Sequence, residues 1–253
     1  MRKRIKQGDD VLLLNETQSY LVRAQKKSLN IDGGIIHLEE LIGKPYGSEV
    51  VTHKGRLFVA VEPNTIDLLK KRMRRMPQII HPKELSLIVG FTGLSRKARV
   101  VEAGTGSGYA TLFLARHCSN GKVFSYEKRR EFYENVKRNL DELGVKNVVL
   151  KNRDILEGID EKGLDLVLLD MKGAERAVPI AHKALKPGGF LVVYSPYIEQ
   201  VKAVVKEIGG LNFSQTTTME CILRHWDVRE HTLPKRSGIL HTGFLTLARK
   251  VSK

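Results

Sequence analysis

Hydrophobic and polar residues alternate in two different ways along this chain. Up to about residue 62, short apolar runs such as VLLL, YLVRA and LFVAV are separated by turns that contain glycine, for example DGG at 32–34 and KG at 54–55. Short apolar runs between glycine turns are typical of β-strands, and no long helical period interrupts them. We therefore predict a small all-β domain over residues 1–62.

The next segment, residues 63–81, is predicted to be a basic linker that begins with a helix. Pro63 and Asn64 open the run TIDLLKKRMRRM, which is expected to end before Pro77, because the residue ahead of a proline disfavours helical backbone. Five of the six residues at 70–75 are Lys or Arg. Such a run is ordinarily a solvated helix face, but in a chain with a net charge of +15 we favour contact with phosphates.

From residue 82 onward, apolar runs alternate with amphipathic segments. Strands are predicted at ARVVEAG, KVFSYE, VVLKN, LDLVLLD, FLVVYSP, CILRHWDVRE and GFLTLARKV, and helices at PKELSLIVGFTGL, YATLFLARHC, REFYENVKRNLDELG, AVPIAHKAL and IEQVKAVVKEIGG. This alternation is typical of a parallel sheet covered by helices on both faces. We therefore predict an α/β domain over residues 82–253. The single tryptophan, Trp226, lies among apolar positions of one predicted strand and is expected in the core.

The run VVEAGTGSGY places glycines at 104, 106 and 108, between a predicted strand and a predicted helix. In open α/β sheets, ligands bind beyond the carboxyl ends of the strands, where a glycine turn lets the backbone approach them. The dinucleotide fingerprint G-x-G-x-x-G/A would put the large Tyr109 or Thr111 at its third position, and the Gly-Lys-Ser/Thr end of a P-loop is absent. The pattern therefore disfavours NAD and ATP, and a nucleoside cofactor without a pyrophosphate fits better.

Four carboxylates, Glu102, Glu127, Asp154 and Asp170, fall at the ends of successive predicted strands. Any one of them alone could equally be a helix cap or a turn residue. Parallel strands bring their carboxyl ends to one edge, so four in register predict a site there. A carboxylate at Glu127 can accept bonds from both hydroxyls of a ribose, and one at Asp154 can accept a bond from an exocyclic amine.

Composition narrows the class of partner. The formal net charge is +15, which favours a polyanion such as nucleic acid over a neutral small molecule, although a solvated basic surface is the alternative. No apolar run reaches the about 18 residues of a membrane span, and the start MRKRIKQGDD lacks the apolar stretch of a secretory signal. We therefore expect a cytoplasmic protein with no membrane partner. The two cysteines, Cys118 and Cys221, lack ligand spacing, which predicts no metal site.

The sequence resembles the class I S-adenosylmethionine-dependent methyltransferases, and among them the TrmI-type tRNA (adenine-N1)-methyltransferases. These modify adenine 58 of the T loop, and archaeal members also modify adenine 57. The resemblance rests on LIGKPYGSEVVTHKG, RRMPQIIHPKELSLIV, VVEAGTGSG, LKPGGFLVVYSP and HTGFLTLARK. It implies a Rossmann-like, mostly parallel sheet with an antiparallel last strand, beside the small N-terminal β domain. It also implies S-adenosylmethionine as cofactor, tRNA as substrate and a homotetramer.

The same resemblance implies roles for individual residues. Asp170 would be catalytic, facing both the cofactor and the target adenine. The implied cofactor-binding residues are Gln78, Ile79, Ile80, Glu102, Gly104, Thr105, Gly106, Ser107, Gly108, Glu127, Asp154, Ile155 and Asp170. The expected contacts with RNA are His81, Arg72, Arg74, Arg75, Lys235 and Arg236.

Two departures from the family pattern concern the choice of base. The family usually follows its catalytic Asp with a turn that contains proline, where this chain has Met171-Lys172-Gly173. The family also often carries Tyr where this chain has His81, ahead of Pro-Lys.

Two other functions are alternatives to a tRNA methyltransferase. One is a methyltransferase acting on a protein or small molecule, which the β domain and basic linker disfavour, and the other is a catalytically silent RNA-binding paralogue. The intact glycine turn and strand-end acids disfavour the silent paralogue.

Overall fold

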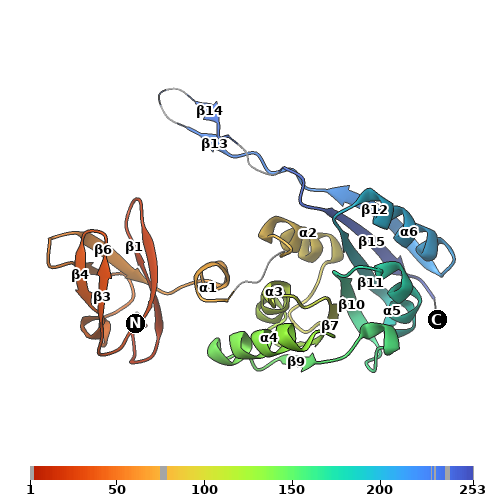
Figure 1. The fold of residues 1–253 in the computed structure, drawn as a ribbon, viewed down its shortest axis with the longest axis horizontal. Helices are drawn as coiled ribbons and strands as arrows, with labels where there is room; N and C mark the ends of the chain where they lie inside the picture. The colour runs from red at the N-terminus through yellow and green to blue at the C-terminus, as the bar shows by residue number, and fades with distance from the viewer. Residues whose placement is uncertain (1–2, 75–78, 229, 231, 237–239, 253) are drawn as a thin grey trace. The chain divides into compact units, whose positions relative to one another are not determined.

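The computed structural model describes residues 3–74, 79–228, 230, 232–236 and 240–252 (Figure 1). The chain divides into two compact units, 1–73 and 74–253. The finer division into 1–62, 63–81 and 82–253 stays a prediction. The linker helix α1 (Thr65–Lys71) is part of the first unit, and it ends five residues before the predicted Met76. Like charges four residues apart along KKRMRR disfavour a longer helix.

The first unit contains an antiparallel sheet in the order β2-β1-β6-β5. Its strands are β1 (Asp10–Leu14), β2 (Ser19–Arg23), β5 (Ser48–Val51) and β6 (Leu57–Val61), and the hairpin β3 (Ser28–Ile31) and β4 (Gly34–His37) precedes a short 3-10 helix, η1 (Leu38–Leu41). Alternate residues such as Val11, Leu13 and Phe58 point inward and are fully buried. The predicted N-terminal β domain is therefore confirmed.

The second unit contains a seven-stranded sheet in the order β12-β15-β11-β10-β7-β8-β9. The bounds are β7 (Arg99–Ala103), β8 (Lys122–Tyr126), β9 (Val148–Lys151), β10 (Leu164–Leu169), β11 (Leu185–Ser195), β12 (Phe213–Glu220) and β15 (Phe244–Lys250). Strands β7 to β11 pair in parallel, and β15 is antiparallel to both of its neighbours. The predicted mostly parallel sheet with an antiparallel last strand is confirmed.

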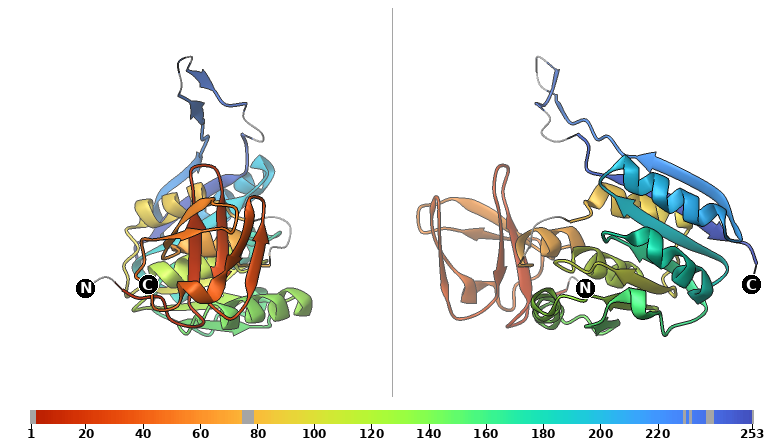
Figure 2. Two further views of the ribbon diagram at one scale, coloured as in Figure 1. Left: turned by 90° about the vertical axis from the view of Figure 1, so that its left-hand side faces the viewer. Right: turned by 45° about the vertical axis from the view of Figure 1, so that its right-hand side comes forward.

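Helices cover both faces of this sheet, as Figures 1 and 2 show. Their bounds are α2 (Pro82–Thr92), α3 (Tyr109–His117), α4 (Arg130–Glu142), α5 (Val178–Ala184) and α6 (Ile198–Gly209), with 3-10 turns η2 (Ile155–Glu157) and η3 (Ala174–Ala177). Residues of α5 and α6 form one apolar core with buried strand residues such as Val167 and Leu191. Because both faces are covered, the central strand β10 is apolar at every position but Asp165.

The predicted strand over CILRHWDVRE is wrong. The strand that pairs with β15 is β12, which ends at Glu220, directly before the predicted strand. The described parts of residues 221–243 form only the two-residue strands β13 (Trp226–Asp227) and β14 (Leu233–Pro234). Strand β12 is an exposed edge strand rich in threonine, so its sequence carries no apolar signal. Trp226 is 51% exposed, which corrects its predicted place in the core, since β13 leaves the sheet (Figure 1).

No helix in the described ranges combines the length and the apolar character that crossing a bilayer requires.

Candidate active site

A pocket of about 620 Å³ opens at the carboxyl ends of the parallel strands. Three of the four strand-end acids, Glu127, Asp154 and Asp170, line it together with Gly104. The sheet order places β10, which ends before Asp170, between β11 and β7. Asp170 therefore lies between the ends of β11 on one side and of β7, β8 and β9 on the other. Topology alone thus brings together residues that are far apart in the chain.

The fourth acid, Glu102, lies under the glycine turn and not in the pocket. Its side chain is 1% exposed and accepts hydrogen bonds from the hydroxyls of Thr111, at 2.6 Å, and Ser125, at 2.8 Å. Burial raises the pKa of Glu102 to about 7, although the hydrogen bonds from the two hydroxyls act to lower it. Ser125 also bonds Thr105, at 2.6 Å. Glu102 therefore anchors the turn from below, on the face covered by α3.

The glycine turn brings the end of β7 against the end of β10. A Cβ on Gly104, whose φ is +85°, would lie 1.7 Å from the backbone oxygen of Asp170. Only glycine fits there, because that neighbour is rigid backbone. The Asp170 N–H donates to the carbonyl of Ala103 at 2.8 Å, which fixes the start of the loop after β10. The turn thereby positions the Asp170 backbone as well as its own amides.

Glu127 is held at the pocket wall by three donors. Its side chain is 3% exposed and accepts bonds from the amide of Gly106, at 3.1 Å, and from the amide and Nε of Arg129, at 3.0 and 3.2 Å. A carboxylate offers about four lone-pair sites, so it retains capacity for a ligand hydroxyl. Gly108 and the buried Ser107 complete the turn, and α3 starts directly after it. The positive end of that helix dipole therefore faces the turn.

Asp154 is the N-cap of the short turn η2, and Ile155 is its first residue. The Asp154 carboxylate accepts a bond from the amide of Leu156 at 3.0 Å, and its side chain is 27% exposed. The Ile155 side chain is 2% exposed and contributes an apolar surface to the pocket. A carboxylate next to an apolar patch suits an aromatic ring that carries an amine.

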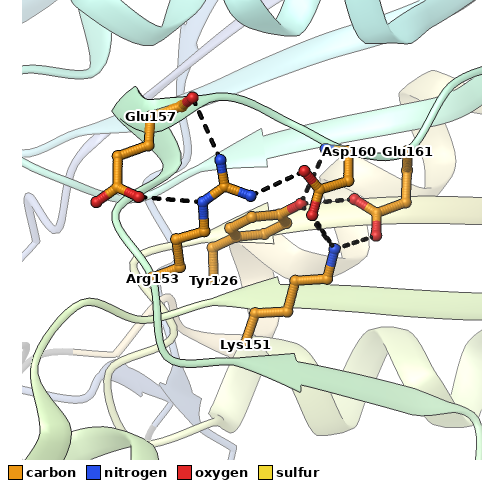
Figure 3. Close-up of polar contacts among 6 residues, drawn as sticks. All are labelled: Tyr126, Lys151, Arg153, Glu157, Asp160 and Glu161. Carbon is orange, nitrogen blue, oxygen red and sulfur yellow. Dashed lines mark hydrogen bonds and ion pairs between the residues drawn. The ribbon is translucent and has the colours of Figure 1, made fainter.

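A polar network fixes the loop that carries these two residues (Figure 3). The Lys151 ammonium bonds Asp160 at 2.8 Å and Glu161 at 2.5 Å, and the Tyr126 hydroxyl donates to Glu161 at 2.7 Å. Arg153 reaches Asp160 at 2.8 Å. Burial lowers the pKa of Lys151, but its bonds to the two carboxylates raise it overall. The closely spaced opposite charges in KNRDILEGIDEK are the sequence signal for this network, which the strand-end pattern does not reveal.

The Asp170 carboxylate is free to meet a ligand. The residue is partly exposed, and no other residue of the described ranges bonds its side chain. Burial raises the pKa of Asp170 to about 7. A carboxylate without a protein partner in a pocket of this size is a candidate for direct contact with substrate or cofactor.

The segment before α2 lies outside the pocket lining. Ile80 is buried, Ile79 is half-buried and His81 is exposed at the start of α2. None of these three residues lines the pocket. Gln78 and Arg75 lie outside the described residues.

The remaining predicted RNA contacts have different environments. Arg72, in the first unit, pairs with Asp10 at 2.7 Å. Arg74 is exposed, and its backbone is bonded to Asn139 of α4. Lys235 and Arg236 are exposed just after β14. The structure thus leaves the side chains of Arg74, Lys235 and Arg236 accessible to a polyanion, whereas Arg72 is already paired.

Sequence reasoning missed several residues that line the pocket. Those with polar or aromatic side chains are Tyr126, Lys128, Arg129, Arg153, Tyr194, Tyr197 and Gln200. The run SPY at 195–197, which spans the end of a predicted strand, is the sequence signal for Tyr194, Tyr197 and Gln200. Within the part of the chain that the structure describes, no group of three or more His, Cys, Asp or Glu residues could hold a metal ion.

Comparison with known proteins identifies similar sequences over nearly the whole chain. Residues 57–242 match the family model described as tRNA methyltransferase complex GCD14 subunit. The tRNA (adenine(57)-N(1)/adenine(58)-N(1))-methyltransferase TrmI of Methanocaldococcus jannaschii is 35% identical over 94% of each chain. The tRNA (adenine(58)-N(1))-methyltransferase TrmI of Thermus thermophilus is 34% identical over 87% of this chain and 90% of its own.

Two solved structures are similar to this chain over nearly its whole length. An S-adenosylmethionine-dependent O-methyltransferase from Thermotoga maritima superposes with a TM-score of 0.88 at 35% identity, covering 98% of this chain and 95% of that one. TrmI from Aquifex aeolicus superposes with a TM-score of 0.83 at 27% identity, covering 99% of this chain and 100% of that one. The matched family model and the two curated relatives together show that this chain belongs to the TrmI-type tRNA methyltransferases.

Proposed function

We propose that this chain transfers the methyl group of S-adenosylmethionine to N1 of adenine 58 in the T loop of tRNA. The observation that carries the proposal is the pocket around the Asp170 carboxylate, which no other described residue bonds, in a chain 35% identical to a relative named for this reaction. That relative, from an archaeon, is named for adenine 57 as well. Adenine 57 is therefore a second candidate position on the same substrate.

The pocket residues suit the proposed cofactor. Glu127 would hold the ribose, Asp154 would accept a bond from the adenine amine, and Ile155 would pack on the adenine ring. Gly104 is the residue of the glycine turn that lines the pocket, and its lack of a side chain would let the methionine part of the cofactor approach the backbone there. When bound, S-adenosylmethionine supplies a methyl group on a positively charged sulfur. The network around Lys151 keeps the Asp154 loop in place before the cofactor arrives.

Asp170 would act on the target base. Adenine N1 carries an in-plane lone pair, so no proton has to leave before it attacks, and the main requirement is alignment at near-attack distance. The Asp170 carboxylate can accept a bond from the N6 amine and stabilise the positive charge that the base acquires. The base must leave its stack to present its Watson–Crick edge. Asp170 therefore both orients the base and offsets its charge.

One observation favours a second candidate, methyl transfer to a hydroxyl oxygen. The Thermotoga relative is described as an O-methyltransferase, and a carboxylate with a pKa of about 7 is suited to take a hydroxyl proton as general base. The net charge of +15 and the names of the curated relatives favour tRNA over this alternative.

Methyl transfer from labelled S-adenosylmethionine to an unmodified tRNA transcript tests the proposal. Matched transcripts carry guanine at position 57, at position 58, or at both. We expect incorporation that falls strongly with the change at position 58, and any remainder should disappear with the double change. Cofactor binding without incorporation into any transcript would exclude this function.

We also propose that the basic surface contacts the tRNA backbone and that the chain acts as a homotetramer in the cytoplasm. Arg74, Lys235 and Arg236 have exposed side chains suited to phosphates, and His81 is exposed at the start of α2. Association of copies is supported by exposed apolar residues around the β13–β14 hairpin. These are Ile222, Leu223, Trp226, Val228 and Leu233, which are 51–76% exposed.

The raised pKa of Asp170 predicts that cofactor affinity depends on pH. A sulfonium beside this carboxyl favours its ionised form, so binding should release a proton below pH 7. We expect the Kd of S-adenosylmethionine to rise by up to about tenfold per unit as the pH falls below the Asp170 pKa. S-adenosylhomocysteine, whose sulfur is neutral, is the control and should show a smaller slope in isothermal titration calorimetry. Equal slopes for the two ligands would contradict the prediction, and Asp170→Asn should remove the difference.

A further inference from the structure

We propose that Tyr197 is the aromatic platform on which the target base stacks, in the part of the pocket beyond Asp170. This inference rests on the proposed function and names a residue that recognises the substrate of the same site. Its basis is the order of the strands, the way Tyr197 is held, and the chemistry that its ring can recognise.

The pocket extends to both sides of Asp170. The residues proposed for the cofactor follow β7, β8 and β9, which lie on one side of β10 in the sheet. On the other side lies β11, and Tyr194, Pro196, Tyr197 and Gln200, at and beyond its end, line the same pocket. This second part contains none of the acids assigned to the cofactor. It therefore offers space on the opposite side of Asp170, where an acceptor base has to lie.

Tyr197 has a fixed backbone and a free ring. It precedes the first residue of α6, and its carbonyl accepts bonds from the amides of Gln200, at 3.1 Å, and Val201, at 3.3 Å. The side chain is 65% exposed, and within the described ranges its ring and hydroxyl form no hydrogen bond or ring contact. By contrast, Tyr194 is 9% exposed and donates its hydroxyl to the carbonyl of Thr242 at 2.5 Å. Tyr194 is thus part of the wall, whereas Tyr197 presents its ring to an incoming ligand.

The chemistry of this surface selects a planar, apolar face. A base that leaves the tRNA stack loses its neighbours, and an aromatic ring at the pocket mouth restores one stacking contact. A tyrosine ring does this without reading the sequence, because every base has a π-face. Asp170 supplies the polar contact at the edge of the base. The two residues therefore contact different parts of the base, since Tyr197 stacks on its plane and Asp170 orients its reactive edge.

The test compares Tyr197→Ala with Tyr197→Phe in steady-state methylation of the tRNA transcript. Stacking losses of this kind correspond to about 5- to 150-fold. We expect Tyr197→Ala to raise the KM for tRNA by about tenfold or more, while Tyr197→Phe stays near wild type and the Kd of S-adenosylmethionine is unchanged. Phe91→Ala is the matched control, because Phe91 is 58% exposed on α2 and does not line the pocket.

A transcript with 2-aminopurine at the target position reports stacking directly. Stacking on Tyr197 quenches the fluorescence of 2-aminopurine, so the complex with Tyr197→Ala should be brighter than the wild-type complex. An unchanged tRNA KM, equal loss in the Ala and Phe variants, or a loss that accompanies a change in molecular mass by sedimentation would overturn the inference. The last result would assign Tyr197 to an interface between copies. Failure of the wild-type protein to methylate tRNA would instead refute the proposed function.

Discussion

Asp170→Asn is expected to slow methyl transfer by roughly a hundredfold or more, because it removes a charge placed beside the developing cation. The amide has nearly the shape of the carboxyl group, so the pocket and the bond from the Asp170 amide to Ala103 should persist. Single-turnover kinetics at saturating cofactor and tRNA measure the chemical step without interference from binding. The loss should therefore appear in the rate constant of that step.

Two controls separate this effect from misfolding. The affinity for the product S-adenosylhomocysteine should stay within about twofold, since its sulfur carries no positive charge for Asp170 to stabilise. The thermal midpoint should not fall, because burial already disfavours the charged form of this side chain in the folded protein. Turnover close to wild type would remove Asp170 from the reaction and direct attention to another group in the pocket.

Gly104→Ala is expected to abolish measurable cofactor binding and to lower the thermal midpoint by several degrees. The new Cβ would lie 1.7 Å from the backbone oxygen of Asp170, so the ends of β7 and β10 would have to separate. That movement would displace the Asp170 backbone and the amides of the glycine turn together. Calorimetric titration with S-adenosylmethionine and thermal unfolding measure the two consequences.

Gly93→Ala is the matched control for this substitution. Gly93 also has a positive φ, +60°, but a Cβ there meets nothing within 4 Å. Its cost should be confined to the left-handed backbone, about 1 kcal/mol, with cofactor affinity unchanged. If both variants bound the cofactor equally well, the close approach of Gly104 to Asp170 would have no functional importance.

Local pattern was enough to predict the architecture of both units. Apolar runs separated by glycine turns predicted the N-terminal sheet, and apolar strands alternating with amphipathic helices predicted the parallel sheet. These periods arise from the geometry of single elements, which is why a sequence records them. The strand-end acids followed from the same logic, since the carboxyl ends of parallel strands share one edge.

The predictions from sequence were wrong where the exposure of a residue depends on neighbours that are distant in the chain. Strand β12 carries polar threonines because it is an edge strand, and Trp226 is exposed because its hairpin leaves the sheet. No local pattern distinguishes such a strand from a loop, or such a tryptophan from a core residue.

By itself, then, the sequence determined the fold class, the glycine turn and the set of acids at the ends of the parallel strands. Only the tertiary structure decided which of those acids reach the pocket. Glu102 points to the face covered by α3 and is bonded there, whereas Glu127, Asp154 and Asp170 line the open space. The tertiary structure also decided that Tyr197 joins them, because the order of β11 and β10 in the sheet is not written in either strand. Side-chain direction at a strand end depends on pleat and packing, and adjacency depends on topology, so neither can be read from a local run of residues.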